Sequence, residues 1–261
     1  MTPAAVIVLA VVLPILAGPL IVLSGRRPNL REAVTLITGG ATFLLVVSLL
    51  PQVMAGLRPE VTILEVLPGL TLAFQVEPLG MLFGLVASGL WIVTSVYSIG
   101  YVRGHHETEQ TRYFFFFAVA ITAAIGVAFS RNLLTLFIFY EMLTLSTYPL
   151  VTHTRTSEAM RGGRIYLGIL ISTSVAFLLL AIVWTWHLTG TLEFTPGGIL
   201  AGHADSGVVT VLLVLFAFGT GKAALMPFHR WLPAAMVAPT PVSALLHAVA
   251  VVKAGVFTVM K

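Results

Sequence analysis

The sequence predicts an all-α membrane protein with about eight transmembrane helices. Apolar residues make up 58% of the 261 residues and only 9% are charged, whereas roughly a quarter of the residues of a soluble domain are charged. A run of about 20 apolar residues is long enough to cross the hydrocarbon core of a bilayer. Eight such segments can be drawn along the chain: 4–23, 33–57, 78–102, 113–130, 132–152, 164–187, 208–228 and 240–261.

The charges between the spans predict which side of the membrane each loop faces. The first span is followed, not preceded, by basic residues, which favours a retained helix over a signal peptide. Nine arginines follow spans one, three, five and seven, namely Arg26, Arg27, Arg31, Arg103, Arg112, Arg155, Arg161, Arg164 and Arg230. The other loops carry only Arg58 and Arg131. Because basic loops stay on the cytoplasmic side, we expect both termini on the outer side.

The loop 58–77 is the one sizeable insertion between spans. Its two halves begin at Val61 and Thr71, are rich in strand-forming residues, and flank Pro68-Gly69. This arrangement is typical of a short β-hairpin. We therefore expect a hairpin on the outer side of the membrane.

Composition and motifs also exclude several classes of function. The chain has no cysteine, which removes Fe–S clusters, disulfides and thiolate metal sites. Its formal charge of +4 comes from too few residues to form a nucleic-acid-binding surface. Gly219-Thr-Gly221-Lys222 resembles the end of a phosphate-binding loop, but Ala223 stands where Ser or Thr is required. Adjacent histidines at His105-His106 are interpreted as solvated loop residues. We expect no metal, no cofactor and no nucleic-acid partner.

Lysine and arginine are used at different depths. All eleven arginines lie in loops or at span ends, whereas Lys222, Lys253 and Lys261 fall inside apolar spans. Glu141 is the one acid in the middle of a span. Arginine is always protonated, but a desolvated lysine loses its proton readily. This partition indicates a proton or cation path through the bilayer, because charges at membrane depth are usually paired and functional.

The fifth span carries further polar groups beside Glu141. Thr144 and Tyr148 follow it at spacings of three and seven residues, so the three side chains share one helix face. Two simpler interpretations stay open. Thr144 and Tyr148 could merely satisfy local hydrogen bonds, and Glu141 with a lysine could be a structural pair between helices.

The seventh span is predicted to be broken. Lys222 lies among small residues, and Pro227 follows five residues later. A proline removes the backbone bond to the carbonyl four residues before it, here Ala223. The helix should therefore kink or break just past the lysine. Broken helices at membrane depth usually line a cavity or an ion site.

The eighth span carries two more titratable groups. Pro239-Thr-Pro241 is a good helix start. His247 and Lys253 follow, and they point about 120° apart around an ideal helix. That separation suits a proton relay better than a shared metal site. A histidine that simply packs within its helix is the alternative for His247.

Several of these segments resemble one family. Tyr97-Ser-Ile-Gly-Tyr101, the segment 139–149 around Glu141, the segment 222–233 that begins at Lys222, and the segment 238–255 resemble the antiporter-like membrane subunits. That family includes large subunits of Mrp-type Na⁺/H⁺ antiporters, pumping subunits of respiratory complex I, and relatives in membrane-bound hydrogenases. The similarity is densest from 97 to 255, and segment 149–153 is most similar to the D-type branch of the Mrp subunits.

The resemblance implies a fold and a path. The family fold contains two inverted five-helix repeats, and this chain would hold the first, 113–261, after three N-terminal helices in 1–112. Because the last span reaches Lys261 without a cap, we expect a piece of a longer protein that lacks the second repeat. Glu141 would pair with Lys222, and His247 would assist Lys253 in passing the proton laterally. The supporting residues would be Thr144, Tyr148, Pro227 and His229.

The function so predicted is that of a transporter subunit and not of an enzyme. It would translocate protons in a multisubunit monovalent cation (Na⁺)/proton antiporter of the bacterial cell membrane, with other membrane subunits as partners. One alternative is a pumping subunit of a complex I-type oxidoreductase or a membrane-bound hydrogenase. A second alternative is a structural subunit that moves no ions.

Overall fold

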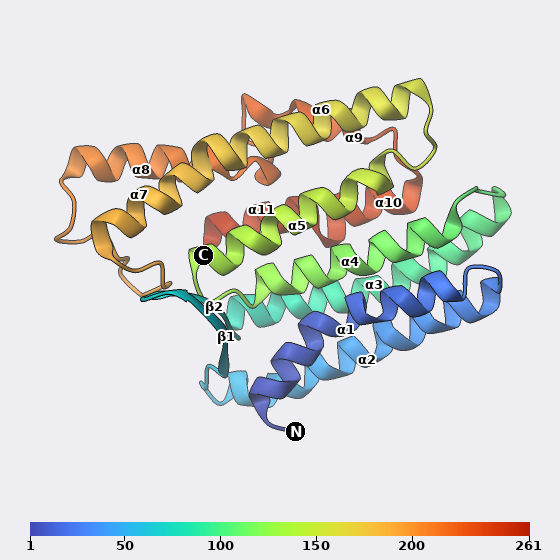
Figure 1. Cartoon of the computed structure of the whole chain (residues 1–261), viewed down its shortest axis with the longest axis horizontal. Coiled ribbons are helices and arrows are strands. Elements are labelled where there is room, and N and C mark those ends of the chain that lie inside the picture. The colour runs from blue at the N-terminus through green and yellow to red at the C-terminus, as the bar shows by residue number, and fades with distance from the viewer.

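The computed structural model describes all 261 residues and is helical except for one hairpin (Figure 1). Its first part consists of α1 (Pro3–Leu23), α2 (Pro28–Met54), β1 (Glu60–Leu67), β2 (Leu70–Gln75), α3 (Pro78–Gly104), α4 (Gln110–Ala128) and α5 (Leu133–Val151). Its second part consists of α6 (Ser157–Thr173), the π-helical turn η1 (Ser174–Leu179), α7 (Leu180–Thr189), α8 (Ser206–Gly219), the 3₁₀ turns η2 (Gly221–Ala223) and η3 (Phe228–Arg230), α9 (Trp231–Ala235), α10 (Thr240–Ala244), the π-helical turn η4 (Leu245–Val249) and α11 (Val251–Met260).

Seven helices are long and apolar enough to cross a membrane, and they correspond to predicted spans one to six and eight. The sixth is a continuous helix of 33 residues, Ser157–Thr189, that contains the π-helical turn η1. The seventh predicted span is not one helix, since α8 has 14 residues and ends at Gly219. The all-helical membrane fold is thus confirmed, with one span interrupted.

Helix boundaries follow local chemistry. Three helices begin on a proline, at Pro3, Pro28 and Pro78, where the missing N–H would have had no helical partner. At the start of α5 the side chain of Asn132 accepts a hydrogen bond from the N–H of Thr135. At the start of α6 Thr156 accepts one from the N–H of Ala159. Such caps satisfy N–H groups that the helix itself leaves free.

The connections gather at two ends of the bundle. The turns between α1 and α2, α3 and α4, and α5 and α6 lie together at the right-hand end in Figure 1, with the α9–α10 connection beside them. Eight of the nine arginines lie in the first three of these turns or at the helix ends beside them, whereas Arg230 lies in η3 before α9. The hairpin and the α7–α8 loop lie at the opposite end. The structure therefore gives the molecule a basic end and a hairpin end, which agrees with the predicted topology.

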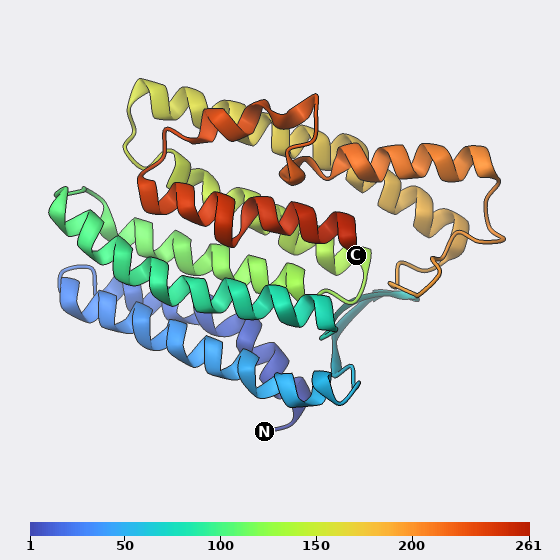
Figure 2. The ribbon, with the colours of Figure 1, turned by 180° about the vertical axis from the view of Figure 1, so that it is seen from behind.

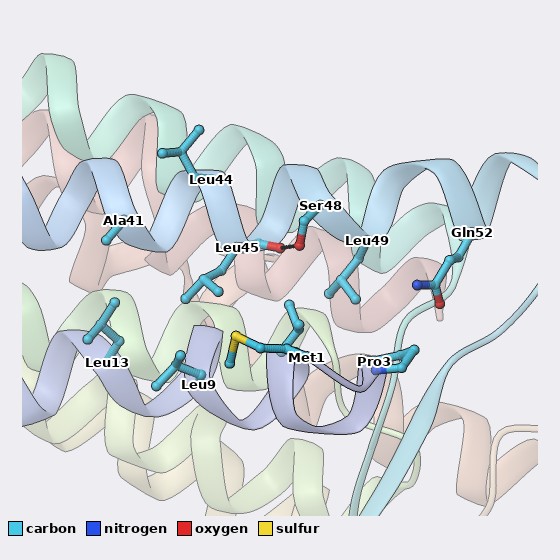
Figure 3. Close-up of a pocket in the computed structure, with 11 residues that line it drawn as sticks. Met1, Pro3, Leu9, Leu13, Ala41, Leu44, Leu45, Ser48, Leu49 and Gln52 are labelled. Carbon is cyan, nitrogen blue, oxygen red and sulfur yellow. Dashed lines mark hydrogen bonds between the residues drawn. The ribbon is translucent and has the colours of Figure 1, made fainter.

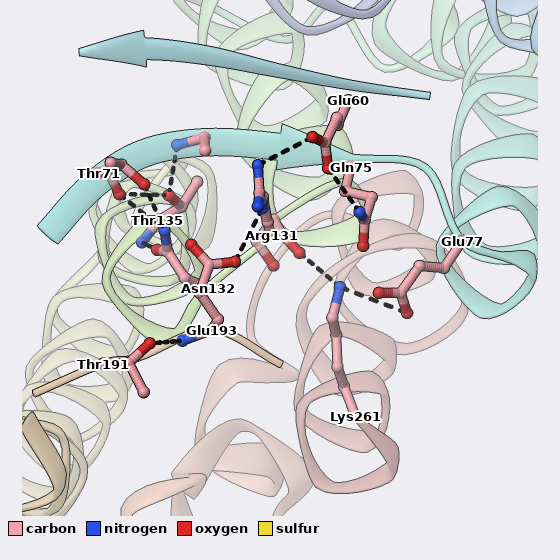
Figure 4. A network of polar contacts seen from close by, with 12 residues as sticks. Glu60, Thr71, Gln75, Glu77, Arg131, Asn132, Thr135, Thr191, Glu193 and Lys261 are labelled. Carbon is pink, nitrogen blue, oxygen red and sulfur yellow. Dashed lines mark hydrogen bonds and ion pairs between the residues drawn. The ribbon is translucent and has the colours of Figure 1, made fainter. Parts of the chain in front are cut away.

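The predicted hairpin is confirmed and fastens the turn between α4 and α5. Strands β1 and β2 pair antiparallel, and the N–H of Arg131 donates to the carbonyl of Ala73. The Arg131 side chain forms ion pairs with Glu60 and Glu193 (Figure 4). Lys261 reaches the same region, and its ammonium donates to the carbonyl of Ser130. The hairpin end is thus held by charges from four separate segments.

Helix α4 lies at the centre of the bundle. Its residues from Ala120 to Ala128 are all buried, and it packs against α1, α3 and α5. The last span lies beside α3 (Figure 2). The division of the chain at 112/113 stays a prediction, because the structure packs α4 against helices on both sides of that boundary.

Candidate functional site

The break in the seventh span begins before the lysine and not after it. Helix α8 ends at Gly219, and Lys222 lies inside the single 3₁₀ turn η2. Ala224 then takes the left-handed backbone, with φ of 55°. Pro227 lies further along the irregular segment, with its side chain exposed. The sequence predicted a break just past Lys222 because of Pro227, and this placement was wrong by several residues.

Two glycines at the break pack closely against the sixth span. A Cβ added to Gly219 would lie 2.4 Å from the backbone nitrogen of Leu178, and one added to Gly221 would lie 2.2 Å from the Thr173 hydroxyl oxygen. Both neighbours belong to the sixth span, at or beside the π-helical turn η1. π-Helical turns are found often at functional sites. The two glycines therefore bring the broken segment against an irregular point of the neighbouring helix.

The backbone groups freed by the break have new partners. The N–H of Lys222 donates to the hydroxyl oxygen of Tyr140, at 3.0 Å. The indole N–H of Trp231 donates to the carbonyl oxygen of Gly221, at 2.9 Å. Irregular backbone at membrane depth requires such replacements, because no water competes there.

The Lys222 side chain is completely buried. Its ammonium donates to the Thr144 hydroxyl at 2.6 Å and lies 3.2 Å from the centre of the Tyr140 ring. The face of an aromatic ring attracts a cation. The ammonium is thus held by one hydroxyl and one ring, both on α5.

Glu141 is near this site but forms no ion pair with Lys222 or any other residue. Both of its carboxylate oxygens are buried and have no hydrogen-bond partner. The reason lies in the rotation of α5, because Lys222 packs on the side that carries Tyr140 and Thr144, and Glu141 points away from Tyr140 by about 100°. The expected Glu141–Lys222 pair is therefore open in this structure.

The eighth span touches the break through its backbone and not through its titratable groups. A Cβ on Gly255 would lie 2.2 Å from the backbone nitrogen of Ala223. Lys253 is exposed, and no hydrogen bond or ion pair involves its side chain. His247 lies in the π-helical turn η4 with Nε2 2.7 Å from the sulfur of Met236. Neither residue contacts the other or Lys222.

The remaining predicted residues divide into two groups. Tyr148 is half-buried on α5, where its ring faces Gly163 of α6. His229 is exposed in η3 and, like Pro227, does not reach Lys222. The structure therefore brings Lys222 and Thr144 together, keeps Glu141 and Tyr148 nearby on α5, and leaves the other predicted groups apart.

Three aromatic side chains and one threonine around Lys222 were missed by the sequence reading. They are Tyr140, Tyr166, Thr173 and Trp231, each at most 2% exposed. Tyr140 could have been found, because it precedes Thr144 by four residues and so lies on nearly the same face. Thr173 and Trp231 come from other segments, and no spacing in the sequence relates them to the lysine.

A large cavity lies elsewhere, between α1 and α2 near the hairpin end (Figure 3). It has a volume of about 620 Å³ and is lined mostly by apolar side chains, among them Leu9, Leu13, Leu45 and Leu49. No residue of the Lys222 site borders it. This cavity is therefore separate from the polar site.

Comparison with known proteins bears on the same region. A family model described as NADH:quinone oxidoreductase/Mrp antiporter, transmembrane, matches residues 130–261. A protein of Staphylococcus haemolyticus named as antiporter subunit mnhA2 is 30% identical over 194 residues, which cover 73% of this chain and 24% of that protein. Its namesake in Staphylococcus aureus is 29% identical over 197 residues, covering 74% and 24%. The chain thus spans about a quarter of the length of these relatives.

Two solved structures share the fold. The structure of an archaeal respiratory membrane complex, the membrane-bound sulfane sulfur reductase, contains a chain with a TM-score of 0.86 and 24% identity. The match covers 97% of this chain and 52% of that one. A chain of the Mrp complex from Dietzia sp. DQ12-45-1b has a TM-score of 0.78 and 25% identity, covering 97% and 27%.

Proposed function

The chain belongs to the NADH:quinone oxidoreductase/Mrp antiporter transmembrane family, and from this premise we propose that it translocates protons as a subunit of a multisubunit monovalent cation/proton antiporter. Na⁺ is the proposed counter-transported cation, and the bacterial cell membrane is the proposed location. The staphylococcal relatives carry the name mnhA2. A closer relation to the D-type branch of the Mrp subunits, which segment 149–153 suggests, is part of the proposal.

The observation that supports this function best is the completely buried Lys222 in a broken helix. Its ammonium is held by the Thr144 hydroxyl and the Tyr140 ring, with no carboxylate in contact. A nearby carboxylate favours the charged form of a lysine, and burial without one favours the neutral form. Movement of Glu141 toward and away from Lys222 would therefore load and release one proton.

The onward path is a further part of the proposal. The backbone of α11 crosses the break at Gly255, two residues after Lys253. Because Lys253 is exposed, a released proton would leave this bundle through Lys253 toward the adjoining part of the transporter, with His247 assisting. Thr144 and Tyr148 would support the path on α5, and Pro227 and His229 would support it on the broken segment.

The test replaces Lys222 in the assembled complex with arginine or with methionine. Neither side chain can bind and release a proton, since arginine stays charged and methionine has no titratable group. We expect proton transport in inverted membrane vesicles, followed with a ΔpH-sensitive dye, to be abolished while the complex still assembles. Lys253→Arg should also block transport if the onward path runs through Lys253, and it should leave assembly unchanged because Lys253 is exposed. Full transport by both Lys222 variants would refute the proposal.

A second candidate function is a pumping subunit of a redox-driven complex, because the family description also includes NADH:quinone oxidoreductase. The same Lys222 path would then be driven by electron transfer in other subunits. Purification of the intact complex from native membranes separates the two candidates. A quinone- or NADH-binding module that co-purifies favours the redox complex, whereas small membrane subunits alone favour the antiporter. A structural subunit predicts instead that Lys222→Met combined with Glu141→Gln keeps transport and impairs assembly.

A further inference from the structure

A buried histidine lies at the basic end of α5, outside the path described above. His153 follows the last residue of α5 by two positions and is 2% exposed. Its Nε2 lies 3.8 Å from a carboxylate oxygen of Glu107, and its ring packs edge-on against Tyr113. Neither ring nitrogen forms a hydrogen bond of good geometry, and the nearest backbone partner is Thr108. Most buried polar side-chain atoms are hydrogen-bonded, so this histidine is unusual for a packing residue.

The charges around His153 come from three segments. Glu107 and Glu109 belong to the α3–α4 connection, and Arg112 belongs to the first turn of α4. The guanidinium of Arg112 donates to the backbone carbonyl of His153 at 2.9 Å, and Arg155 is near enough to Arg112 for the two charges to repel. Burial lowers the pKa of His153 most and Arg112 lowers it further, whereas Glu107, the backbone of Thr108 and Glu109 raise it. The protonation state of this imidazole thus depends on how burial and Arg112 balance against these groups.

Hydroxyl-bearing side chains, here called the hydroxyl line, are spaced between His153 and Lys222 along the contact between α5 and α6. The Thr152 hydroxyl donates to the carbonyl of Tyr148, the Tyr148 ring faces Gly163 of α6, and the hydroxyl groups of Thr147 and Tyr166 lie 2.6 Å apart. Thr144 completes the line at the Lys222 ammonium. Nine residues of helix separate Thr144 from His153, about 13 Å at 1.5 Å per residue.

The other direction along α5 has a different character. Between Thr135 and Tyr140 the helix carries only Leu136, Phe137, Ile138 and Phe139. The Thr135 hydroxyl is itself engaged with the N–H of Ala73 on the hairpin. Polar groups therefore continue from Lys222 to the basic end of α5, and one apolar turn separates Lys222 from the hairpin end.

We propose that His153 is a proton-exchange residue with Glu107 as its ion-pair partner. It takes protons from the basic end of the molecule and passes them to the hydroxyl line that ends at Lys222. The inference deepens the proposed function and rests on it. Imidazole suits this task because it changes charge near physiological pH. Glu107 is the natural intermediary, since its side chain is 20% exposed and that of His153 is 1% exposed.

The test uses the assembled complex in vesicles and compares His153→Gln with His106→Gln. Glutamine keeps polarity and approximate size but cannot bind a proton, and His106 is an exposed histidine in the loop that carries Glu107. We expect His153→Gln to lower proton transport about tenfold or more, a typical loss when a proton-transfer group is removed. His106→Gln should match the unchanged protein.

A second variant, Glu107→Gln, decides the matter even where His153→Gln fails to assemble. Glu107 raises the pKa of His153, so its neutralisation leaves less of the imidazole protonated at a given pH. The pH profile of transport should therefore move to lower pH, whereas a merely structural role would leave its position unchanged. An unmoved profile overturns the proposal, as does full transport by His153→Gln. If either of these two results is found while Lys222→Met abolishes transport, only the role of His153 is refuted. If Lys222→Met still transports protons, the proposed function itself is refuted.

Discussion

The fifth and seventh spans meet at Lys222 but are built in opposite ways. Helix α5 is continuous over 19 residues, although Pro149 inside it has no N–H to donate. In the seventh span the helix ends at Gly219. The side chains of Tyr140 and Trp231 form hydrogen bonds with backbone groups after this end that have no helical partner. The titratable lysine lies on the broken element, and the groups that hold its ammonium lie on the continuous one.

Because of this difference, we expect α5 to stay fixed and the broken segment of the seventh span to shift. A regular helix fixes its side chains firmly, since its backbone and packing leave few alternatives. A single 3₁₀ turn between irregular segments has fewer internal bonds, and such elements supply the local rearrangements that proteins use. The lysine can thus change its distance to Glu141 if the broken segment shifts while α5 stays in place.

The largest effect is expected where the broken seventh span packs against the sixth span, in the variant Gly219→Ala. The added Cβ would lie 2.4 Å from a backbone nitrogen of Leu178, and a backbone atom cannot rotate away. We expect a loss of about 3 kcal/mol, at the upper end of the usual cost of overpacking. The midpoint of thermal unfolding of the purified protein in detergent measures it.

Gly168→Ala is the matched control, because nothing lies within 4 Å of a Cβ at that helical position. Alanine there should leave stability unchanged or raise it by up to about 1 kcal/mol. Equal unfolding midpoints for the two variants would show that the contact at Gly219 does not shape the break.

A smaller effect is expected where the two spans exchange a single hydrogen bond. Thr144→Val removes the only hydrogen-bond acceptor of the buried Lys222 ammonium, and losing a bond to a buried charged group costs about 1.5–3 kcal/mol. Thr144→Ser keeps the hydroxyl and should recover most of the stability and transport. If Thr144→Val and Thr144→Ser transport alike, the hydroxyl does not serve the lysine.

The regular part of the fold could be predicted from sequence to a large extent. Apolar runs locate spans one to six and eight, because length and composition alone decide whether a helix can cross a bilayer. The predicted starts of the second and sixth spans, 33 and 164, come later than the observed Pro28 and Ser157. The hairpin around Pro68-Gly69 follows from turn chemistry. The presence of a break near Lys222 follows from the small residues that flank this lysine and from Pro227.

The details of the site could not be predicted, because they depend on contacts between distant segments. The backbone of Leu178 lies against Gly219, where α8 ends, and neither residue reveals this contact in the sequence. The rotation of α5 puts Tyr140 and not Glu141 against Lys222. The exposure of Lys253 depends on which face of α11 packs against the bundle. Sequence thus identified the titratable residues but not which of them touch.

The smallest effect is expected for a buried hydroxyl within the regular bundle. Ser88 of α3 is fully buried, and its side chain donates to the carbonyl of Gly84 at 2.7 Å, within its own helix. In Ser88→Ala that carbonyl keeps its helical N–H partner, so the loss should be below about 1 kcal/mol, near the net value of one neutral hydrogen bond. Unfolding midpoints and vesicle transport for Ser88→Ala and Thr144→Val give a direct contrast. If the two variants lose stability and transport equally, a hydroxyl at the break contributes no more than one inside the regular bundle. The distinction between adjustable and fixed elements would then be wrong.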